Sequence, residues 1–128
     1  MINEIKELDA VGRFVVQAAF SVHTALGPGL PDKVYTLCLA HELKKSGLAV
    51  DEDVTVPIRY DDLTIEGGLQ IPLLVNRVAI IELKNIGHLG ALDQAILFGH
   101  LRLMNLRLGY IINFNMPAIK DGIHRIFI

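Results

Sequence analysis

The sequence predicts a fold of the α+β or α/β class, in which helices flank a mixed β-sheet. Two helical segments come first, a run of strands follows, and a further helix precedes the last two strands. The central stretch, residues 68–85, reads GLQIPLLVNRVAIIELKN and holds two apolar runs separated by a polar dipeptide, a pattern typical of a β-hairpin. Because 128 residues suit one domain with one core, we expect a single domain over residues 1–128.

The first helix is predicted over residues 4–26. Asn3 is a suitable helix cap, apolar side chains recur at helical spacing, and Gly27-Pro28-Gly29 ends the pattern. His23 lies in the last turns of this helix. The sequence offers no second histidine or cysteine at ligand spacing, so we expect His23 to pack or to interact with the helix end.

A second helix is predicted between Pro31 and Gly47, since proline favours a first helical turn and glycine favours a helix end. Asp32 lies in its first turn, where a carboxylate complements the helix dipole; the alternative is a functional carboxylate aimed at the sheet. Tyr35, one turn later, is expected to hydrogen-bond near Asp32. The single Cys38 is expected to be a small buried residue, consistent with a reducing, cytoplasmic setting.

Strands are predicted from runs of β-branched and aromatic residues between turn signals. Pro57 indicates an edge or bent strand, and Asp61-Asp62 indicates a solvated turn. The segment from residue 85 to Gly90, which contains His88, is expected to be a loop. The predicted strands are residues 50–60, 63–69, 71–75, 78–84, 106–113 and 123–128.

The third predicted helix, residues 91–105, is apolar on nearly every side. A helix of this kind is usually buried on most sides, and in a short chain we expect neighbouring subunits to supply part of that burial. Hydrophobic residues make up 52% of the chain, and the mean hydropathy is +0.42. No apolar run approaches the ~18 residues that span a bilayer, and the charged N-terminus is not a signal peptide. We therefore expect a homo-oligomer without membrane contact, whose candidate interface residues are Leu97, Phe98, Leu101 and Met104.

The charge pattern does not favour a nucleic-acid-binding module. The net charge is −2, and the basic residues Arg102, Arg107 and Lys120 are isolated rather than arranged in a stripe. Nucleic acid is therefore only a weakly supported partner.

Glu82 and Lys84 are the most informative charged pair. Two residues apart on a strand, they share one face, although the surrounding sequence VAIIEL predicts a buried strand. One explanation is a structural ion pair at a sheet edge. The other is a metal-dependent hydrolase, in which a carboxylate binds a divalent cation and a neighbouring lysine positions or deprotonates water.

Several segments along nearly the whole chain carry a family resemblance. They are VHTALGPGL at 22–30, PDKVY at 31–35, LLV at 73–75, IELK at 81–84, LGYIINFN at 108–115 and KDGIHRI at 120–126. With these segments the sequence resembles the GxxExxY proteins, a bacterial and archaeal branch of the PD-(D/E)XK nuclease-like superfamily. The resemblance implies a restriction-endonuclease-like core and a metal-dependent nuclease site.

The resemblance also implies which positions would form that site. The glutamate of the second helix corresponds to Asp32, and the glutamate and lysine of the ExK triplet correspond to Glu82 and Lys84. The principal metal-binding aspartate corresponds to Pro72, which offers no side-chain ligand.

Two positions on the third helix also depart from the family pattern. A glutamine often found near the metal corresponds to Ile96, and an acidic residue beside it corresponds to Gln94. Because polar positions became apolar at Pro72 and Ile96, we expect a catalytically degenerate domain that self-assembles through apolar helical surfaces. No cofactor is expected. The alternative is a weak Mg²⁺-dependent DNA endonuclease in which Asp32 and Glu82 bind the ion and Lys84 acts on the water.

Overall fold

The computed structural model describes residues 2–84, 87 and 89–128, and it confirms the predicted α+β class. The predicted loop around His88 lies partly outside these residues. The elements in chain order are α1 (Ile2–Leu26), α2 (Asp32–Lys45), β1 (Val50–Tyr60), β2 (Leu63–Val75), β3 (Ala79–Leu83), α3 (Ala91–Met104), β4 (Leu108–Ile112), the short 3₁₀ helix η1 (Ile119–Gly122) and β5 (Ile123–Phe127).

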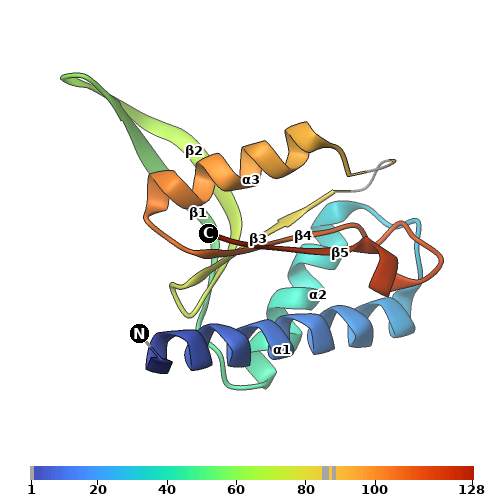
Figure 1. The fold of residues 1–128 in the computed structure, drawn as a ribbon. Coiled ribbons are helices and arrows are strands. Elements are labelled where there is room, and N and C mark those ends of the chain that lie inside the picture. The colour runs from blue at the N-terminus through green and yellow to red at the C-terminus, as the bar shows by residue number, and fades with distance from the viewer. Residues whose placement is uncertain (1, 85–86, 88) are drawn as a thin grey trace.

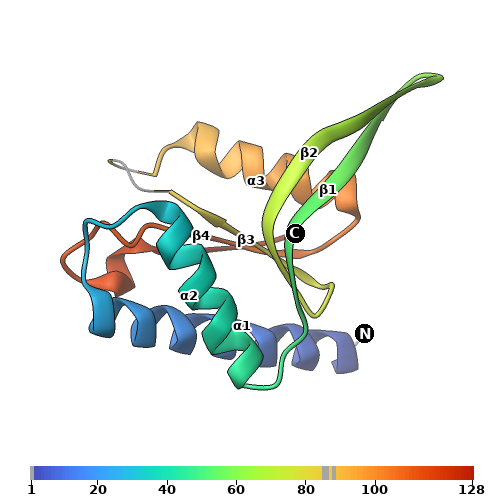
Figure 2. The ribbon, with the colours of Figure 1, turned by 180° about the vertical axis from the view of Figure 1, so that it is seen from behind.

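One five-stranded sheet organises the fold, with the strands in chain order from β1 to β5. Only β3 and β4 are parallel, and α3 is the crossover helix between them. Helices α1 and α2 lie on one face of the sheet, and α3 lies on the other (Figure 1). The view from behind shows the same three layers (Figure 2).

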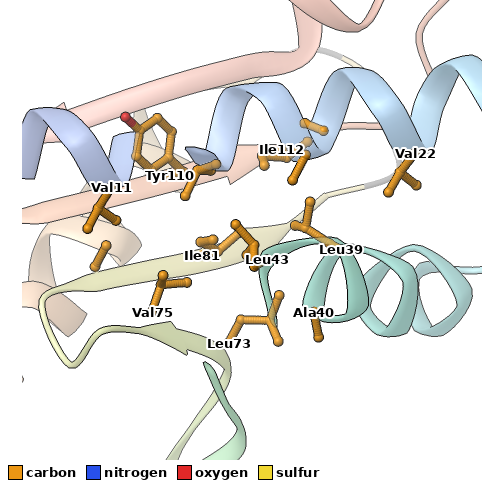
Figure 3. Packing of buried hydrophobic residues seen from close by; sticks show 14 of the residues in the cluster. Val11, Val22, Leu39, Ala40, Leu43, Leu73, Val75, Ile81, Tyr110 and Ile112 are labelled. Carbon is orange, nitrogen blue, oxygen red and sulfur yellow. The ribbon is translucent and has the colours of Figure 1, made fainter. Parts of the chain in front are cut away.

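The two faces of the sheet are covered unequally. Among the described residues, the cluster between the sheet and helices α1 and α2 contains 20 buried ones, including Leu39, Ile81 and Tyr110 (Figure 3). The cluster beneath α3 contains six of the described residues, and Leu97 and Leu101 are its buried side chains from the helix. The sheet face beneath the single helix α3 therefore has much the smaller core.

Strand β2 differs from the prediction, because the segments predicted as residues 63–69 and 71–75 form one continuous strand. Gly67 has a positive φ of 66°, and the β1–β2 register shifts between Val56 and Ile58. The glycines are therefore part of a bulge within the strand pair rather than the end of a strand. Pro57 lies at this register shift, and its strand β1 is at the edge of the sheet, as predicted. The β1–β2 hairpin projects beyond the rest of the sheet (Figures 1 and 2).

The turn between β2 and β3 confirms the predicted hairpin. Asn76 and Arg77 both have positive φ angles, 51° and 56°, as a two-residue type I′ turn requires. The Asn76 side-chain oxygen accepts a hydrogen bond from the Ala49 N–H at 2.8 Å. This bond ties the turn to the start of β1.

Within this chain helix α3 is buried on one side only, and the expected burial by neighbouring subunits stays a prediction. Of its described residues only Leu97 and Leu101 are buried, because the sheet covers one side of the helix and no other element covers the opposite side. Leu97 and Leu101 therefore belong to the chain's own core and are wrong as interface candidates. Met104 is partly buried against the same core, and Phe98 is 42% exposed.

The remaining helix predictions have mixed outcomes. His23 is packed as expected, with its Nε2 donating to the Met116 carbonyl at 2.8 Å and its ring stacked on Phe114. Cys38 is only partly buried, because it lies at the margin of the core rather than inside it. Among the described residues, no helix is both long and apolar enough to cross a bilayer.

Candidate functional site

Strand β3 turns Glu82 and Lys84 toward α3. Ala79 and Ile81 belong to the cluster under α1 and α2, whereas Ile80 belongs to the cluster under α3. Alternation along the strand therefore directs Glu82 and Lys84 to the α3 side, as the spacing predicts. Lys84 directly follows the last residue of β3, and its N–H donates to the Ile112 carbonyl of β4 at 3.0 Å.

Glu82 is paired with a histidine of α3. Nδ1 of His100 donates to a carboxylate oxygen of Glu82, and the side chains are 21% and 17% exposed, respectively. A largely buried carboxylate requires a partner of this kind, because an unpaired buried charge is costly. The pairing leaves Nε2 as the ring nitrogen of His100 not used by Glu82.

Lys84 is paired with the first turn of the same helix. Its ammonium contacts one carboxylate oxygen of Asp93, and the other oxygen accepts the Gly90 N–H at 3.0 Å. Asp93 is thus both an ion-pair partner and an N-terminal cap of α3. The bond from Lys84, followed by the bond from Gly90, lowers the pKa of the Asp93 carboxyl below its ordinary value.

Pro72 and Glu82 both adjoin the end of the β2–β3 ladder. Leu73 and Ile81 form the last pair of this ladder, and Pro72 and Glu82 are the next residues of the two antiparallel strands. The pyrrolidine ring of Pro72 has neither a carboxylate nor an N–H to contribute to a site beside Glu82.

Comparison with protein families shows which family this chain belongs to. The family model of the PD-(D/E)XK nuclease superfamily matches residues 9–126, nearly the whole chain. This chain belongs to the PD-(D/E)XK nuclease superfamily. No curated protein and no solved structure matched it. Glu82 and Lys84 are this chain's candidates for the acidic residue and the lysine of the superfamily's (D/E)XK motif.

The donor set does not fit the divalent-cation site that the superfamily implies. Mg²⁺ binds oxygen ligands and is usually held by one or two carboxylates with water. Within the described residues, no group of three or more His, Cys, Asp or Glu side chains lies close enough to bind one metal ion. Glu82 is engaged by His100, and Pro72, which adjoins the same end of the β2–β3 ladder, offers no side-chain ligand.

Asp32, the remaining candidate ligand, is not joined to the pair on β3. It begins α2 on the opposite face of the sheet from α3, and no contact between its carboxylate and Glu82 or Lys84 occurs in the described part of the chain. Partial burial raises the pKa of the Asp32 carboxyl, which disfavours the charged form that a metal ligand needs.

The Tyr35 hydroxyl bonds to the backbone of the connection that precedes Asp32. The hydroxyl donates to the Gly27 carbonyl at 2.5 Å and accepts the Leu30 N–H at 3.1 Å. Its ring stacks on Phe114, with 4.5 Å between the ring centroids. Tyr35 therefore fixes the glycine-rich connection between α1 and α2, which is a structural role.

Two α3 positions highlighted by the resemblance lie away from the paired charges. Ile96 is 43% exposed, and Gln94 is also exposed. The α3 residues that reach Lys84 and Glu82 are Asp93 and His100, which were not among the predicted site residues. Their separation of seven residues, two helical turns, is the sequence signal that would have placed them on one side of the helix.

A pocket of about 400 Å³ adjoins Lys84 at the carboxyl ends of the parallel strands β3 and β4. Ligands in open α/β sheets commonly bind at such strand ends. Asn113, which is 6% exposed, is the buried polar residue there, and its side-chain oxygen accepts the Asn115 N–H at 2.9 Å. The described lining residues are Lys84, Gly87, Leu89, Asn113, Asn115, Met116, Asp121, Gly122 and His124.

Proposed function

We propose that this chain is a non-catalytic member of the PD-(D/E)XK nuclease superfamily that associates with itself through apolar helical surfaces. The observation that supports the loss of catalysis best is the proline at position 72, which adjoins the same end of the β2–β3 ladder as Glu82. A carboxylate at position 72 would share a divalent cation with Glu82, whereas proline offers no ligand. Without that ligand we expect the rate of any hydrolysis to fall about 10²-fold or more.

The pairing of Glu82 and Lys84 supports the same proposal. A carboxylate that binds a cation and a lysine that acts on water both need free polar atoms facing the substrate. Here His100 holds the glutamate, and Asp93 holds the lysine. Both partners belong to α3, so the two charges stabilise the packing of the helix on the sheet.

Exposed apolar side chains support the self-association part of the proposal. Large exposed apolar patches often mark protein–protein contacts. Large apolar side chains with 39% or more of their surface exposed occur on α1, α2 and α3. They are Ile2, Ile5, Phe14, Phe20, Leu26, Leu37, Leu92, Ile96, Phe98 and Leu103.

A nuclease assay tests the loss of catalysis. Supercoiled and single-stranded DNA would be incubated with the wild-type protein and either Mg²⁺ or Mn²⁺, with Lys84→Ala and Glu82→Gln proteins prepared in parallel. We expect no cleavage above the level of these variants. Cleavage by the wild type that both substitutions abolish would overturn the proposal, while equal cleavage by all three proteins would indicate a contaminating nuclease.

Restoring the missing ligand tests the physical reason for the loss. We expect Pro72→Asp to increase the affinity for Mn²⁺ in calorimetric titrations, with the matched control Pro57→Asp, in the projecting hairpin, unchanged. Substitution of Ile96 by Gln alongside Pro72→Asp tests whether the second apolar position contributes. If Mn²⁺ already binds the wild type as tightly as the Pro72→Asp variant, position 72 is not the missing ligand.

The second candidate is a weak Mg²⁺-dependent endonuclease in which Asp32 and Glu82 bind the ion and Lys84 acts on the water. The pocket beside Lys84 favours it, because that space is open to a ligand. In this case the DNA assay gives metal-dependent cleavage that Asp32→Asn also abolishes.

A further inference from the structure

A cleft of about 540 Å³ lies between helix α1 and the last two strands, on the sheet face opposite α3. Tyr110 of β4 and Arg125 of β5 are partners in the antiparallel ladder, and both line the cleft. Their side chains therefore share the α1 side of the sheet, where Tyr110 belongs to the core. Helix α1 contributes residues at helical spacing from one of its sides, among them Asp9, Gly12, Arg13 and Val16.

We propose that this α1–β5 cleft binds a small organic monoanion, a carboxylate attached to a short apolar or aromatic group. The cleft volume is in the range of small-molecule sites, which combine apolar walls with a few polar groups. The proposal goes beyond the proposed function and does not depend on it. Glu82 and Lys84 point to the α3 side of the sheet, so the cleft is separate from the candidate nuclease site.

Arg13 supplies a free guanidinium at the cleft. Within the part of the chain that the structure describes, its side chain has no ion pair and no hydrogen bond. A guanidinium presents its N–H groups in a planar fork, which matches the two oxygens of a carboxylate. Arg13 can therefore bind a carboxylate without giving up a contact that the fold uses.

Arg125 supplies a second guanidinium, which is held in position but not saturated. Its Nη2 lies 3.6 Å from Oδ1 of Asp9, and the two side chains are 46% and 54% exposed. Its guanidinium also lies over the Phe127 ring, 5.4 Å from the centroid. An exposed ion pair is weak, and a guanidinium has five N–H donors, so donors remain for a ligand. Two guanidinium groups and the one carboxylate leave a single excess positive charge, which matches a monoanion.

Tyr110 supplies a neutral donor at the floor of the cleft. Its side chain is 2% exposed and directs its hydroxyl toward α1 at Gly12, where a Cβ would clash with the hydroxyl oxygen (Figure 3). The glycine therefore makes room for the hydroxyl. Burial raises the pKa of Tyr110, so its hydroxyl keeps its proton at neutral pH and can donate to an anion. The neighbouring Arg125 guanidinium acts on the oxygen and leaves the proton available.

The remaining wall of the cleft is apolar. Val16 is partly buried and packs against the core beneath α1, and the Tyr110 ring lies in the same core. A ligand that consists only of charge would leave this wall in contact with water. A hydrocarbon group attached to the carboxylate would cover it and gain from the burial of apolar surface.

A titration with sodium benzoate, followed by amide chemical shifts in NMR spectra, tests the proposal. We expect saturable shifts at residues lining the cleft, with a dissociation constant on the order of millimolar. Arg13→Gln and Arg125→Gln should each weaken binding about tenfold or more, because each removes a charged donor. Arg59→Gln, in the β1–β2 hairpin, is the matched control and should bind as the wild type does. Shifts of amides far from the cleft check that each variant is folded.

Asp9→Asn gives a test that loss of folding cannot imitate. This substitution removes the only carboxylate among the described lining residues named here and releases Arg125 from its ion pair. We therefore expect it to strengthen benzoate binding several-fold. Unchanged or weaker binding by a folded Asp9→Asn protein would contradict the assigned charge balance of the cleft.

Two further ligands define what the cleft recognises. Benzyl alcohol has a similar ring and no charge, and it should bind much more weakly than benzoate. Inorganic phosphate has charge and no apolar group, and it should also bind more weakly. Equal binding of benzyl alcohol would overturn the anion site, and equal binding of phosphate would indicate an adventitious ion only. The absence of saturable shifts with benzoate at tens of millimolar overturns the proposal and leaves the nuclease and self-association tests unaffected.

Discussion

The Asp93 carboxylate joins the start of helix α3 to the Lys84 ammonium beyond the end of strand β3. One of its oxygens contacts the ammonium, and the other accepts the Gly90 N–H at 3.0 Å. A single side chain therefore caps the helix and fixes the helix to the sheet. The core between the sheet and α3 is small, so polar contacts of this kind contribute to the position of the helix on the sheet.

The first prediction follows from this double role. Asp93→Ala should lower the free energy of unfolding at neutral pH, and Asp93→Asn, which keeps an acceptor for Gly90, should lower it less. Because the folded-state pKa of Asp93 is depressed, its stabilisation is present above its ordinary pKa of 3.8. It is lost as the pH falls through the lower folded-state pKa.

Urea unfolding at a series of pH values checks this prediction. The difference between wild type and Asp93→Ala should shrink as the pH falls below 3.8. Asp62→Ala, in the exposed β1–β2 turn, is the control and should have little effect at any pH. A difference that stays constant through the acidic range would show that the carboxylate charge contributes nothing.

The second prediction compares two helical glycines. A Cβ at Gly12 would clash with the Tyr110 hydroxyl oxygen, whereas a Cβ at Gly99 would meet nothing within 4 Å. We expect Gly12→Ala to destabilise the protein by about 1–3 kcal/mol through overpacking. Gly99→Ala should stabilise it by up to ~1 kcal/mol through helix propensity.

Thermal and urea unfolding of dilute protein measure both effects on the monomer. Tyr110→Phe removes the oxygen that a Cβ at position 12 would strike, so it should recover part of the stability lost in Gly12→Ala. Equal effects of alanine at positions 12 and 99 would contradict the close packing of Gly12 against Tyr110.

The third prediction concerns Tyr35. Tyr35→Phe leaves the Gly27 carbonyl and the Leu30 N–H without their hydroxyl partner. We expect the free energy of unfolding to fall by about 1–3 kcal/mol, the cost of unsatisfied partly buried polar groups. Tyr60→Phe is the matched control, because Tyr60 is 75% exposed at the end of β1. A similar loss in both variants would mean that the hydroxyl bonds of Tyr35 are not responsible.

The fourth prediction concerns the β2–β3 turn. Arg77 has a φ of 56°, a conformation that costs a side-chain-bearing residue about 1–2 kcal/mol and that glycine adopts freely. Arg77→Gly should therefore stabilise the protein, by about 0.5–1 kcal/mol after the added freedom of the unfolded chain is subtracted. Arg59→Gly, within strand β1, should instead destabilise it. Chemical denaturation of the two variants gives the signs directly.

Local sequence signals were sufficient for most of the fold. Helical spacing, the glycine and proline end signals, and the Asn76-Arg77 dipeptide predicted the helices and the central hairpin, because these features depend on neighbouring residues. The Gly67-Gly68 pair misled the strand prediction. The same glycines that end a strand also permit a bulge inside one, and the partner strand decides between these outcomes.

The candidate site was predictable only in part. The ExK spacing placed Glu82 and Lys84 on one face of a strand, since alternation is a property of the strand itself. Their partners Asp93 and His100 lie on α3, and the crossover between parallel strands brings that helix over them. A sequence pattern carries no distance between elements, so the pairing could not be predicted.

The sequence by itself determined the secondary structure, the superfamily resemblance and the absence of a carboxylate at position 72, because each depends on residue identity and local spacing. The tertiary structure alone decided which side of the apolar helix α3 is buried. Periodicity shows that a helix has several apolar sides, but the elements packed around it determine which of them water reaches. Leu97 and Leu101 lie against the sheet, whereas Leu92 and Leu103 remain exposed.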